Sequence, residues 1–311
     1  MVAGDRRRAA RIWLSGTAVG LGLLITALAV ANYSAERSLI RQLEQDPRIL
    51  AGHDRLVRWT MEVHQADLEQ ELLKLARVVD LKEAILTGDR LELRDQLEPP
   101  LNRLRKGSLQ ISRLTLYTPE GVAQLRAHAL DSYGERVLGA RPLIAETVRA
   151  RRIVKGLETE GDRPHLWAAT PIYHGGRVIG ILEIGSSLAP IIRAIKMVTG
   201  GEVAVLLGSN PFRIIESSAS QLFAQATPRL SAKNSVTRQV FVLDERTYAA
   251  TLVPLKDFSG NEIGCLAILS DASAITGILQ KSNAITFVIG VLGFALAAAL
   301  LGTLLLRRDR A

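Results

Sequence analysis

The pattern of apolar and polar positions is most regular in the middle of the chain, where three short runs have the composition of β-strands. They are Ile153–Thr159, His165–Tyr173 and Val178–Ile184. Gly161-Asp162-Arg163-Pro164 separates the first two runs and His174-Gly175-Gly176-Arg177 separates the last two, and these residue types favour turns. Because consecutive strands joined by short loops pair antiparallel, the pattern predicts a three-strand meander.

Two further strands and a helix precede this meander. Ile111–Tyr117 and Val122–Ala127 flank the turn sequence Thr118-Pro119-Glu120-Gly121, which predicts a hairpin. A helix is predicted near Pro142–Ala150. The order of hairpin, helix and three antiparallel strands is that of a PAS-like sheet, with a ligand cavity between the sheet and its helices.

A second copy of this unit follows. The residues Ala168-Ala169-Thr170 … Ile179-Gly180 recur as Ala249-Ala250-Thr251 … Ile263-Gly264, at offsets of 81 and 84 residues. A repeat at this period indicates two similar domains in tandem rather than a solenoid. The elements predicted for this part are a connecting helix Ser187–Thr199, the strands Glu202–Leu207, Arg213–Glu216, Ser235–Leu243, Thr247–Leu255 and Glu262–Leu269, and a helix Ser220–Ala226.

The region before the two units has helical periodicity. Ser34–Gln45 is predicted to be a helix that breaks at Asp46-Pro47, and a long helix is predicted from Asp54 to Leu86. A change of phase in its apolar stripe fits a helix that packs first on a partner and later on its own domain. A single amphipathic helix lying along one core is the alternative. The stripe changes from Leu56, Trp59, Val63 and Ala66 to Leu68, Leu72, Leu75 and Val79.

A shorter helix is predicted between the long helix and the hairpin. Gly88-Asp89 indicates a helix stop followed by a new N-cap. The helix that starts there is predicted to end at Pro99-Pro100.

Two long uncharged runs lie near the ends of the chain. Ile12–Ala31 has 20 residues and Ala284–Leu306 has 23, and each is long enough to cross a bilayer as a helix. Arginines flank both runs on their outer sides, so the positive-inside rule places both termini in the cytoplasm and the residues between the runs outside it. A cleaved signal peptide is the alternative for the first run, since Ala29-Val30-Ala31 resembles a cleavage site. The run is longer than the usual apolar region of a signal peptide, which favours an uncleaved anchor.

The charge of the chain follows this topology. The formal net charge is +8, of which the two arginine-rich ends carry +5, leaving +3 for the long central part. The high isoelectric point therefore reports membrane orientation rather than nucleic-acid binding, which requires a clustered basic face. The one cysteine, Cys265, cannot form an intrachain disulfide.

The sequence contains no catalytic pattern. HExxH, CxxC, the Walker loop, GxSxG and a Rossmann glycine pattern after a strand are all missing. We therefore expect no enzymatic activity, no cofactor and no metal site. A hydrolase whose site is assembled only by tertiary contacts is an alternative.

Charged residues on otherwise apolar strand faces are the strongest candidates for binding. Glu183 shares a strand face with Ile179 and Ile181, and a carboxylate there requires a cationic or hydrogen-bonding partner. Such groups converging on one concavity would form a polar pocket, and two arginines would favour a carboxylate-bearing ligand. An internal Arg–Glu network that binds nothing is the alternative. For Tyr173 and Trp167, which alternate along one strand, the pattern favours core packing over ligand contact. The predicted ligand-binding residues are Arg126, His128, Arg141, Glu158, Tyr173 and Glu183.

These residues fall in a longer pattern that resembles a double Cache domain. The pattern is Thr118-Pro-Glu-Gly … Leu125-Arg126-Ala-His128 … Gly134-Glu135 … Arg141 … Gly156-Leu-Glu158 … Pro171-Ile-Tyr173 … Gly176 … Gly180-Ile-Leu-Glu183-Ile-Gly185. It is similar above all to the double sensory domain of two-component sensor kinases and diguanylate cyclases, and the resemblance covers residues 51–272. The resemblance implies two lobes that hang from a long N-terminal helix, with the ligand in the membrane-distal lobe.

The sequence departs from that family in four respects. Ala129-Leu130-Asp131 stands where the family has a proline, and Glu135 stands where aspartate is usual. The sequence also contains no kinase or cyclase segment and lacks the amino-acid-binding motif of other double Cache receptors. These departures concern the identity of the ligand and the output partner rather than the fold.

Together these observations predict an α+β fold of two tandem PAS-like (Cache) lobes with antiparallel sheets on a long N-terminal helix, flanked by two transmembrane helices. We expect a sensor of the bacterial inner membrane with a periplasmic central domain, which binds a small polar ligand in its distal lobe. It would signal through the membrane as a homodimer or through a separate signalling protein, and a non-sensing interaction module of a membrane complex is the alternative. The predicted segments are residues 1–11 (cytoplasmic tail), 12–31 (first span), 32–89 (helical segment), 90–199 (membrane-distal lobe), 200–283 (membrane-proximal lobe), 284–306 (second span) and 307–311 (cytoplasmic tail).

Overall fold

The computed structural model describes residues 37–78, 81–208, 211–232 and 235–274, together with isolated positions from 20 to 35 and from 277 to 295. Both predicted membrane spans, 12–31 and 284–306, lie almost entirely outside these residues, and no helix within them is long and apolar enough to cross a bilayer. By its internal contacts the chain forms two units, one of residues 46–243 with 249–270 and one of the remaining residues. The two lobes described below belong to the first unit except for residues 244–248 and 271.

A long helix, α2 (Pro47–Val78), begins where the sequence predicts a break. The Asp46 carboxylate accepts a hydrogen bond from the Arg48 backbone N–H at 2.9 Å, and the fixed φ of Pro47 suits the first helical turn. The prediction of one helix over 54–86 is wrong at both ends, because α2 starts earlier and a separate helix, α3 (Lys82–Thr87), follows it. Leu81 and Ile85 are buried, so α3 packs its own apolar side into the core.

Helix α4 (Arg90–Lys106) continues past the point at which the sequence predicts its end. Gly88 ends α3 in a left-handed conformation, and the Asp89 carboxylate accepts two backbone N–H groups of the first turn of α4, as predicted. Pro99 and Pro100 nevertheless lie inside the helix. An interior proline costs about 3 kcal/mol, whereas each fully buried leucine contributes about 1.5–3 kcal/mol. The apolar face outweighs the lost hydrogen bonds because Leu93, Leu97 and Leu101 are all fully buried.

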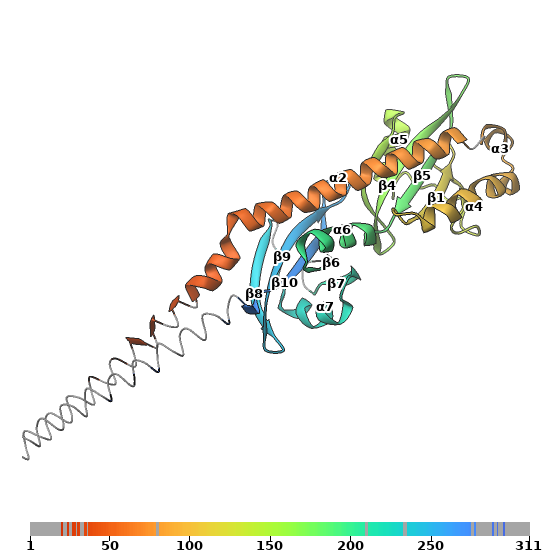
Figure 1. Ribbon diagram of the computed structural model, residues 1–311. Helices are drawn as coiled ribbons and strands as arrows, with labels where there is room; N and C mark the ends of the chain where they lie inside the picture. The colour runs from red at the N-terminus through yellow and green to blue at the C-terminus, as the bar shows by residue number, and fades with distance from the viewer. Residues whose placement is uncertain are drawn as a thin grey trace, which may run out of the picture. The chain divides into compact units, whose positions relative to one another are not determined.

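The first lobe, which is the predicted membrane-distal lobe, contains a five-stranded sheet in the order β2-β1-β5-β4-β3 (Figure 1). The predicted hairpin and meander are confirmed, and antiparallel pairing of β5 with β1 joins them into one sheet. Helix α5 (Pro142–Ala150) has the predicted bounds. The strands are β1 (Ile111–Tyr117), β2 (Ala123–Arg126), β3 (Val154–Glu160), β4 (Arg163–His174) and β5 (Arg177–Ser186).

The second lobe repeats this arrangement. Its five-stranded sheet has the order β7-β6-β10-β9-β8, which is the first order with each strand replaced by its counterpart. Helix α6 (Ala189–Thr199) leads into it, and α7 (Ser220–Ala226) and a short 3-10 helix, η1 (Thr227–Arg229), connect its strands. The predicted tandem of two similar domains is therefore confirmed at the level of strand order. The strands are β6 (Glu202–Leu207), β7 (Arg213–Ser217), β8 (Thr237–Leu243), β9 (Arg246–Lys256) and β10 (Glu262–Asp271).

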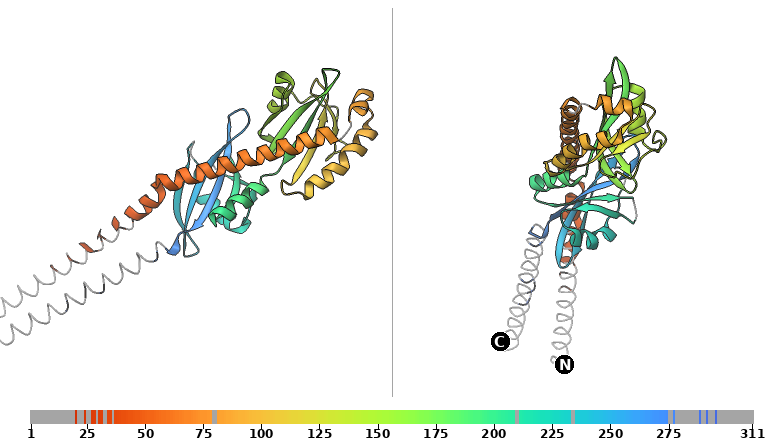
Figure 2. Two further views of the ribbon diagram at one scale, coloured as in Figure 1. Left: turned by 45° about the horizontal axis from the view of Figure 1, so that its top comes forward. Right: turned by 90° about the vertical axis from the view of Figure 1, so that its right-hand side faces the viewer.

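Different helices cover the two faces of the first sheet (Figure 2). Successive residues of a strand point to opposite faces. Leu116 and Leu182 belong to an apolar core that also contains buried residues of α2 and α4. Tyr117 and Ile181, which are the neighbours of Leu116 and Leu182 in their strands, belong to a separate cluster with buried residues of α5. The second of these faces, covered by α5, also carries the charged residues singled out in the sequence.

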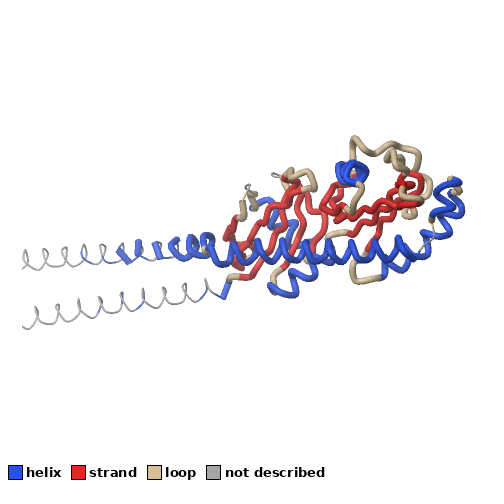
Figure 3. The backbone as a smooth tube through the Cα atoms, turned by 90° about the horizontal axis from the view of Figure 1, so that it is seen from above, coloured by secondary structure: helices blue, strands red, loops and turns tan. Residues whose placement is uncertain are grey.

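Helix α2 lies alongside the strands of both sheets (Figure 3). Its buried residues include Val57 and Leu68, which belong to one cluster together with Leu182 of the first lobe and Val253 of the second. A single long helix therefore contributes to the core of both lobes.

A loop of the second lobe packs on the edge of the first sheet. The backbone N–H of Phe258 donates to the carbonyl of Leu157 at 2.6 Å. The Phe258 ring lies against Gly156, where a Cβ atom would come within 2.8 Å of the ring. Glycine at position 156 therefore permits this contact, and any larger side chain would displace the ring.

Candidate functional site

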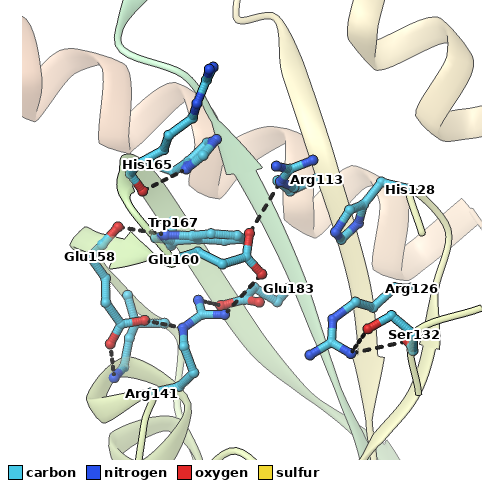
Figure 4. A network of polar contacts seen from close by, with 12 residues as sticks. Arg113, Arg126, His128, Ser132, Arg141, Glu158, Glu160, His165, Trp167 and Glu183 are labelled. Atoms are coloured by element: carbon cyan, nitrogen blue, oxygen red, sulfur yellow. Dashed lines mark hydrogen bonds and ion pairs between the residues drawn. The ribbon is translucent and has the colours of Figure 1, made fainter. Parts of the chain in front are cut away.

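A fully buried carboxylate lies on the face of the first sheet that α5 covers (Figure 4). Glu183 of β5 is 0% exposed. One of its oxygens accepts a hydrogen bond from Nη2 of Arg141 at 2.7 Å, and the other accepts one from the Tyr117 hydroxyl at 2.9 Å. The sequence-based expectation that a carboxylate here needs a cationic or hydrogen-bonding partner is confirmed.

A second buried carboxylate completes this network. Glu158 of β3 pairs with Nε of Arg141 and accepts a hydrogen bond from the backbone N–H of Leu143 at 3.0 Å. Leu143 lies in the first turn of α5, where backbone donors have no partner within the helix. Nε1 of Trp167 donates to the Glu158 carbonyl at 3.0 Å, and the Arg141 guanidinium carbon lies 4.3 Å from the centre of the Trp167 ring. The network therefore joins β1, β3, β4 and β5 to the start of α5.

The guanidinium of Arg141 pairs with both carboxylates of this network, those of Glu158 and Glu183. Burial raises the pKa of Glu183, and the Arg141 guanidinium opposes that rise. Burial lowers the pKa of Arg141, but the neighbouring Glu183, Tyr117 and Glu158 raise it by more, so the guanidinium stays charged. Burial and then the charge of Glu183 raise the pKa of the Tyr117 hydroxyl, which keeps its proton and remains a donor.

An open cavity of about 400 Å³ lies beside this network, and two of the predicted residues line it. Nη1 of Arg126 donates to the carbonyl and the hydroxyl of Ser132 at 3.1 and 3.2 Å, and Arg126 also pairs with Glu135. Nδ1 of His128 lies 3.2 Å from the carbonyl oxygen of Leu114. Burial lowers the pKa of His128 to about 4, so its ring is neutral at neutral pH. The lining consists of Arg113, Arg126, His128, Ala129, Ser132, Glu135, Glu160 and Gly161.

Glu160 connects the cavity to the buried network. Nε of Arg113 donates to one of its oxygens at 3.2 Å, and Nη1 of Arg141 lies 3.9 Å from the other. A change in the position of Glu160 would therefore alter its ion pairs with both Arg113 and Arg141.

Sequence reasoning missed four of the polar residues that line the cavity, and one of them, Glu135, appeared only as part of the family-like pattern. Arg113 lies on the same strand face as Tyr117, and Glu160 lies on the same strand face as Glu158, so a comparison at a period of two residues would have found both. Ser132 lies in the loop between β2 and α5, where no periodic signal exists.

The six predicted ligand-binding residues fall in three places. Arg141, Glu158 and Glu183 form the buried network, and Arg126 and His128 line the cavity. Tyr173 lies apart from both, near the end of β4, where it is 45% exposed and its hydroxyl donates to the carbonyl of Arg151 at 2.7 Å. Core packing is thus confirmed for Trp167, which is fully buried, and is wrong for Tyr173, because the end of the β4–β5 hairpin is exposed.

Other cavities of the described chain differ in their lining, and one of about 330 Å³ next to α2 and β9 includes Arg58, Glu62 and Lys256. A cavity of about 410 Å³ opens among residues of α2, α4 and the start of β1, and its lining, which includes Leu75, Pro100 and Leu104, is mainly apolar. Within the described residues, no group of three or more His, Cys, Asp or Glu side chains is placed to hold a metal ion. The cavity at Arg126 is the principal candidate for a polar ligand because two of the predicted residues, Arg126 and His128, line it.

Several solved structures are similar to this chain. The ligand-binding domain of the Campylobacter jejuni chemoreceptor Tlp3, solved in complex with 4-methylisoleucine, is 14% identical, with a TM-score of 0.42 over 73% of this chain and 92% of that one. The sensor domain of the V. cholerae histidine kinase DctB is 14% identical, with a TM-score of 0.44 over 73% of this chain and 98% of that one. The periplasmic domain of Vibrio cholerae LuxQ is 12% identical, with a TM-score of 0.47 over 71% of this chain and 99% of that one.

The family comparison covers most of both lobes. A search of curated proteins finds no match. A family model described as the double sensory domain of two-component sensor kinase matches residues 61–276, which include every strand of both sheets. Because this match extends over more than half of the sequence, the chain belongs to the double Cache family of sensory domains.

Proposed function

We propose that this chain is a membrane-anchored extracytoplasmic sensor that binds a small polar ligand in the cavity of its first lobe. It relays the signal through the membrane or to a separate partner protein. Membership of a sensory-domain family supports the sensing role. The two uncharged runs with arginines on their outer sides support the anchoring.

The observation that carries the proposal is the presence of both signs of charge around one open cavity. Arg113 and Arg126 supply cationic groups, and Glu135 and Glu160 supply anionic groups. A ligand with a carboxylate and an amine could pair with both kinds, since charge-assisted hydrogen bonds are the strong ones in such sites. We therefore propose a zwitterionic or carboxylate-bearing ligand.

The arginines of the cavity are already paired with glutamates of the same cavity. Arg126 pairs with Glu135, and Arg113 pairs with Glu160. A ligand carboxylate that binds these arginines must compete with the protein's own carboxylates. In this proposal binding therefore releases Glu135 or Glu160, and the release of Glu160 alters its approach to Arg141 and thus the buried network.

The buried residues have a supporting role in this proposal. Arg141, Glu158 and Glu183 satisfy one another, and together they tie the start of α5 to the sheet. We propose that they hold the wall of the cavity in place and that Arg126 and His128 contact the ligand directly.

A thermal-shift screen of the full chain in detergent micelles tests the proposal, using panels of amino acids, small carboxylates and small amines. A ligand at 100 times its Kd raises the unfolding free energy by about 2.7 kcal/mol. A stabilisation of this size gives an easily measured rise in melting temperature. Compounds with both a carboxylate and an amine should give the largest shifts. If no panel member shifts the melting temperature and the chain instead retains a partner protein in pull-down experiments, the interaction module is the better explanation.

A further inference from the structure

The mainly apolar cavity of the first lobe, which opens among α2, α4 and the start of β1, is not used by the proposed function. It measures about 410 Å³ and shares no lining residue with the cavity at Arg126. Two of its walls are deeply buried, since Leu75 of α2 is 7% exposed and Ile111 of β1 is 1% exposed. Cavities that bind small molecules have volumes of about 300–1,000 Å³ and mostly apolar walls. This cavity therefore has the size and the lining of a ligand site.

Contacts outside the cavity hold one of its walls in place. The turn that follows α4 forms this wall with Ser108 and Leu109. The Leu109 carbonyl accepts a hydrogen bond from the Ser186 hydroxyl of β5 at 2.5 Å. The side-chain carbonyl of the next residue, Gln110, accepts one from Nη1 of Arg193 in α6 at 3.3 Å. The cavity is therefore largely preformed, as ligand sites usually are.

The proline pair inside α4 belongs to the opposite wall. Pro100 is buried and lines the cavity. Because proline has no backbone N–H, its ring adds apolar surface to the wall without adding a donor. The one strong departure of α4 from the rules of helix formation thus coincides with the cavity, and such departures are expected at functional sites.

The mouth of the cavity lies in a strongly basic part of the lobe. The flanking segments 71–78 and 99–110 contain five lysines and arginines and a single acidic residue, Glu71. The carboxylate of Glu71 already pairs with Lys74 at 2.6 Å. Within the part of the chain that the structure describes, the guanidinium of Arg103, which lines the cavity, forms no hydrogen bond or ion pair. An excess of positive charge around a concave mouth attracts anions.

We propose that this cavity binds a small amphipathic anion, a carboxylate on a short apolar body, at a site separate from that of the sensor ligand. The apolar body fills the space between Leu75, Leu104 and Ile111, where it leaves water. The carboxylate stays at the open mouth and pairs with Arg103, so that no charge is buried without a partner. The exposed Ser108 hydroxyl on the same rim supplies a further donor.

Protection of a cysteine at the rim tests this inference, with 4-phenylbutanoate as the probe. Ser108→Cys and, for comparison, Ser132→Cys in the Arg126 cavity are made in the full chain with Cys265→Ala, and each is alkylated with iodoacetamide in phosphatidylcholine nanodiscs. Both serines are exposed, so neither substitution disturbs the core. At ten times its Kd the probe leaves about a tenth of the sites free and should slow the alkylation of Ser108→Cys about tenfold. Equal or greater protection of Ser132→Cys would place the probe in the Arg126 cavity and overturn the inference.

Two matched compounds test the class of ligand. 4-Phenylbutanol has the same apolar body without the charge, and it should need at least about five times the concentration for the same protection. Butanoate has the same anion without the ring, and it should need at least about ten times the concentration, because it leaves the apolar walls uncovered. An alcohol as effective as the acid would overturn the anionic class, and butanoate as effective as the probe would overturn the role of the cavity.

Substitutions at the mouth give a second measurement. Arg103→Gln should raise the concentration for half-protection at least about fivefold, whereas Arg105→Gln, in the same turn of α4 but outside the lining, should leave it unchanged. Arg103→Lys should retain most of the affinity because it keeps the charge. Equal effects of Arg103→Gln and Arg105→Gln would overturn the assignment of Arg103. A cysteine at position 108 that is unreactive even without the probe would overturn the inference as a whole, since another protein surface would then cover the cavity.

The two sites can fail separately. Arg126→Ala should leave the protection at position 108 unchanged, because the cavities share no lining residue. A thermal-shift screen without a hit, together with full protection at position 108, would refute the proposed sensor site alone. Ligand shifts that depend on Arg126, together with no protection at position 108, would refute this second site alone.

Discussion

The two lobes have the same strand order but differ in what their sheets bury. Within residues 111–186 of the first lobe the buried polar side chains include the charged residues Arg126, Arg141, Glu158 and Glu183. Among the described residues of 202–271 in the second lobe, Thr251 is the one buried polar residue. At the offset of 84 residues that relates the last strands of the repeat, Ala267 is the counterpart of Glu183, and both are 0% exposed.

This difference shows that the fold does not need a charged network. The second sheet closes over small apolar residues, and replacing a buried ion pair by well-packed apolar residues is often neutral or stabilising. The network of the first lobe is thus an addition to a scaffold that is complete without it. Its position next to an open cavity lined by Arg126 and His128 explains the addition better than stability does.

The largest expected effect comes from placing the charge of the first lobe in the second. Ala267→Glu puts a carboxylate where Ala204 is the residue paired across the strands and where the described residues of the second lobe include no buried arginine. A buried charge without a partner costs about 3–5 kcal/mol. Urea unfolding at neutral pH should show a loss of that size, and the loss should shrink at pH 4, where the buried carboxyl holds its proton.

Ala267→Met is the matched control for size. Overpacking alone costs about 1–3 kcal/mol and has no dependence on pH. If the glutamate and methionine variants are equally stable at neutral pH, the second lobe tolerates the charge, and the contrast between the two lobes loses its physical basis.

A smaller effect is expected from removing the charge of Glu183. Its pKa is raised from 4.5 to about 7 in the folded chain, mainly by burial. The folded state therefore holds a proton that the unfolded state has already lost, so this group's contribution to stability is fully present below pH 4.5 and declines as the pH rises to about 7. A tenfold change in an acid dissociation constant corresponds to about 1.4 kcal/mol, so the decline in unfolding free energy amounts to roughly 3 kcal/mol.

Glu183→Gln should abolish this decline, and the measurement is the unfolding free energy of both proteins from pH 4.5 to 7.5. His128 acts in the opposite sense, because its lowered pKa makes stability rise with pH between about 4 and 6.5. His128 is present in both proteins, so the difference between the two curves isolates Glu183. A constant difference across this range would mean that Arg141 keeps Glu183 ionised throughout.

The contrast between the lobes also explains what the sequence could predict. The strands and α5 follow from local apolar periodicity and turn residues, and the hairpin and the meander follow from short connections. The pairing of β1 with β5, which joins them into one sheet, links strands far apart in the sequence. Glu183 is identifiable because a charge on an apolar strand face needs a partner, and that reasoning depends on one strand alone. The identity of its partner depends on the loop that brings Arg141 over β5. No local sequence pattern predicts that Arg141 and Glu183 come within hydrogen-bonding distance.

Two of the sequence-based predictions, the end of α4 at Pro99-Pro100 and the core packing of Tyr173, are wrong for the same kind of physical reason. Pro99-Pro100 ends a helix by local rules, but the burial of three leucines on one face of α4 outweighs the lost hydrogen bonds. Tyr173 alternates with residues of the buried part of β4, but the strand continues beyond the part of the sheet that other elements cover. In both cases tertiary packing, which is not visible in a short window of sequence, decides the outcome.

The smallest expected effect on stability, and the largest on function, comes from Arg126. Its side chain is 9% exposed, but its carboxylate partner Glu135 is 46% exposed, so the loss of this pair is compensated by water. Arg126→Ala should cost about 1 kcal/mol or less of unfolding free energy. Arg141→Ala is the contrasting variant, because it leaves Glu158 and Glu183 buried without a cation and should cost about 3–5 kcal/mol.

Arg126→Ala should have a small effect on stability but a large effect on ligand affinity. A charge-assisted contact is worth about 1.5–3 kcal/mol, so Arg126→Ala should raise the Kd of the ligand found by thermal shift about 10- to 150-fold. Arg149→Ala, on the exposed side of α5, removes a pair with Glu146 whose arginine is 76% exposed and should change neither stability nor Kd appreciably. A loss of melting temperature in unliganded Arg126→Ala as large as that in Arg141→Ala would make Arg126 a structural residue. The cavity would then have to bind its ligand through Arg113 alone, which a matching Arg113→Ala titration would show.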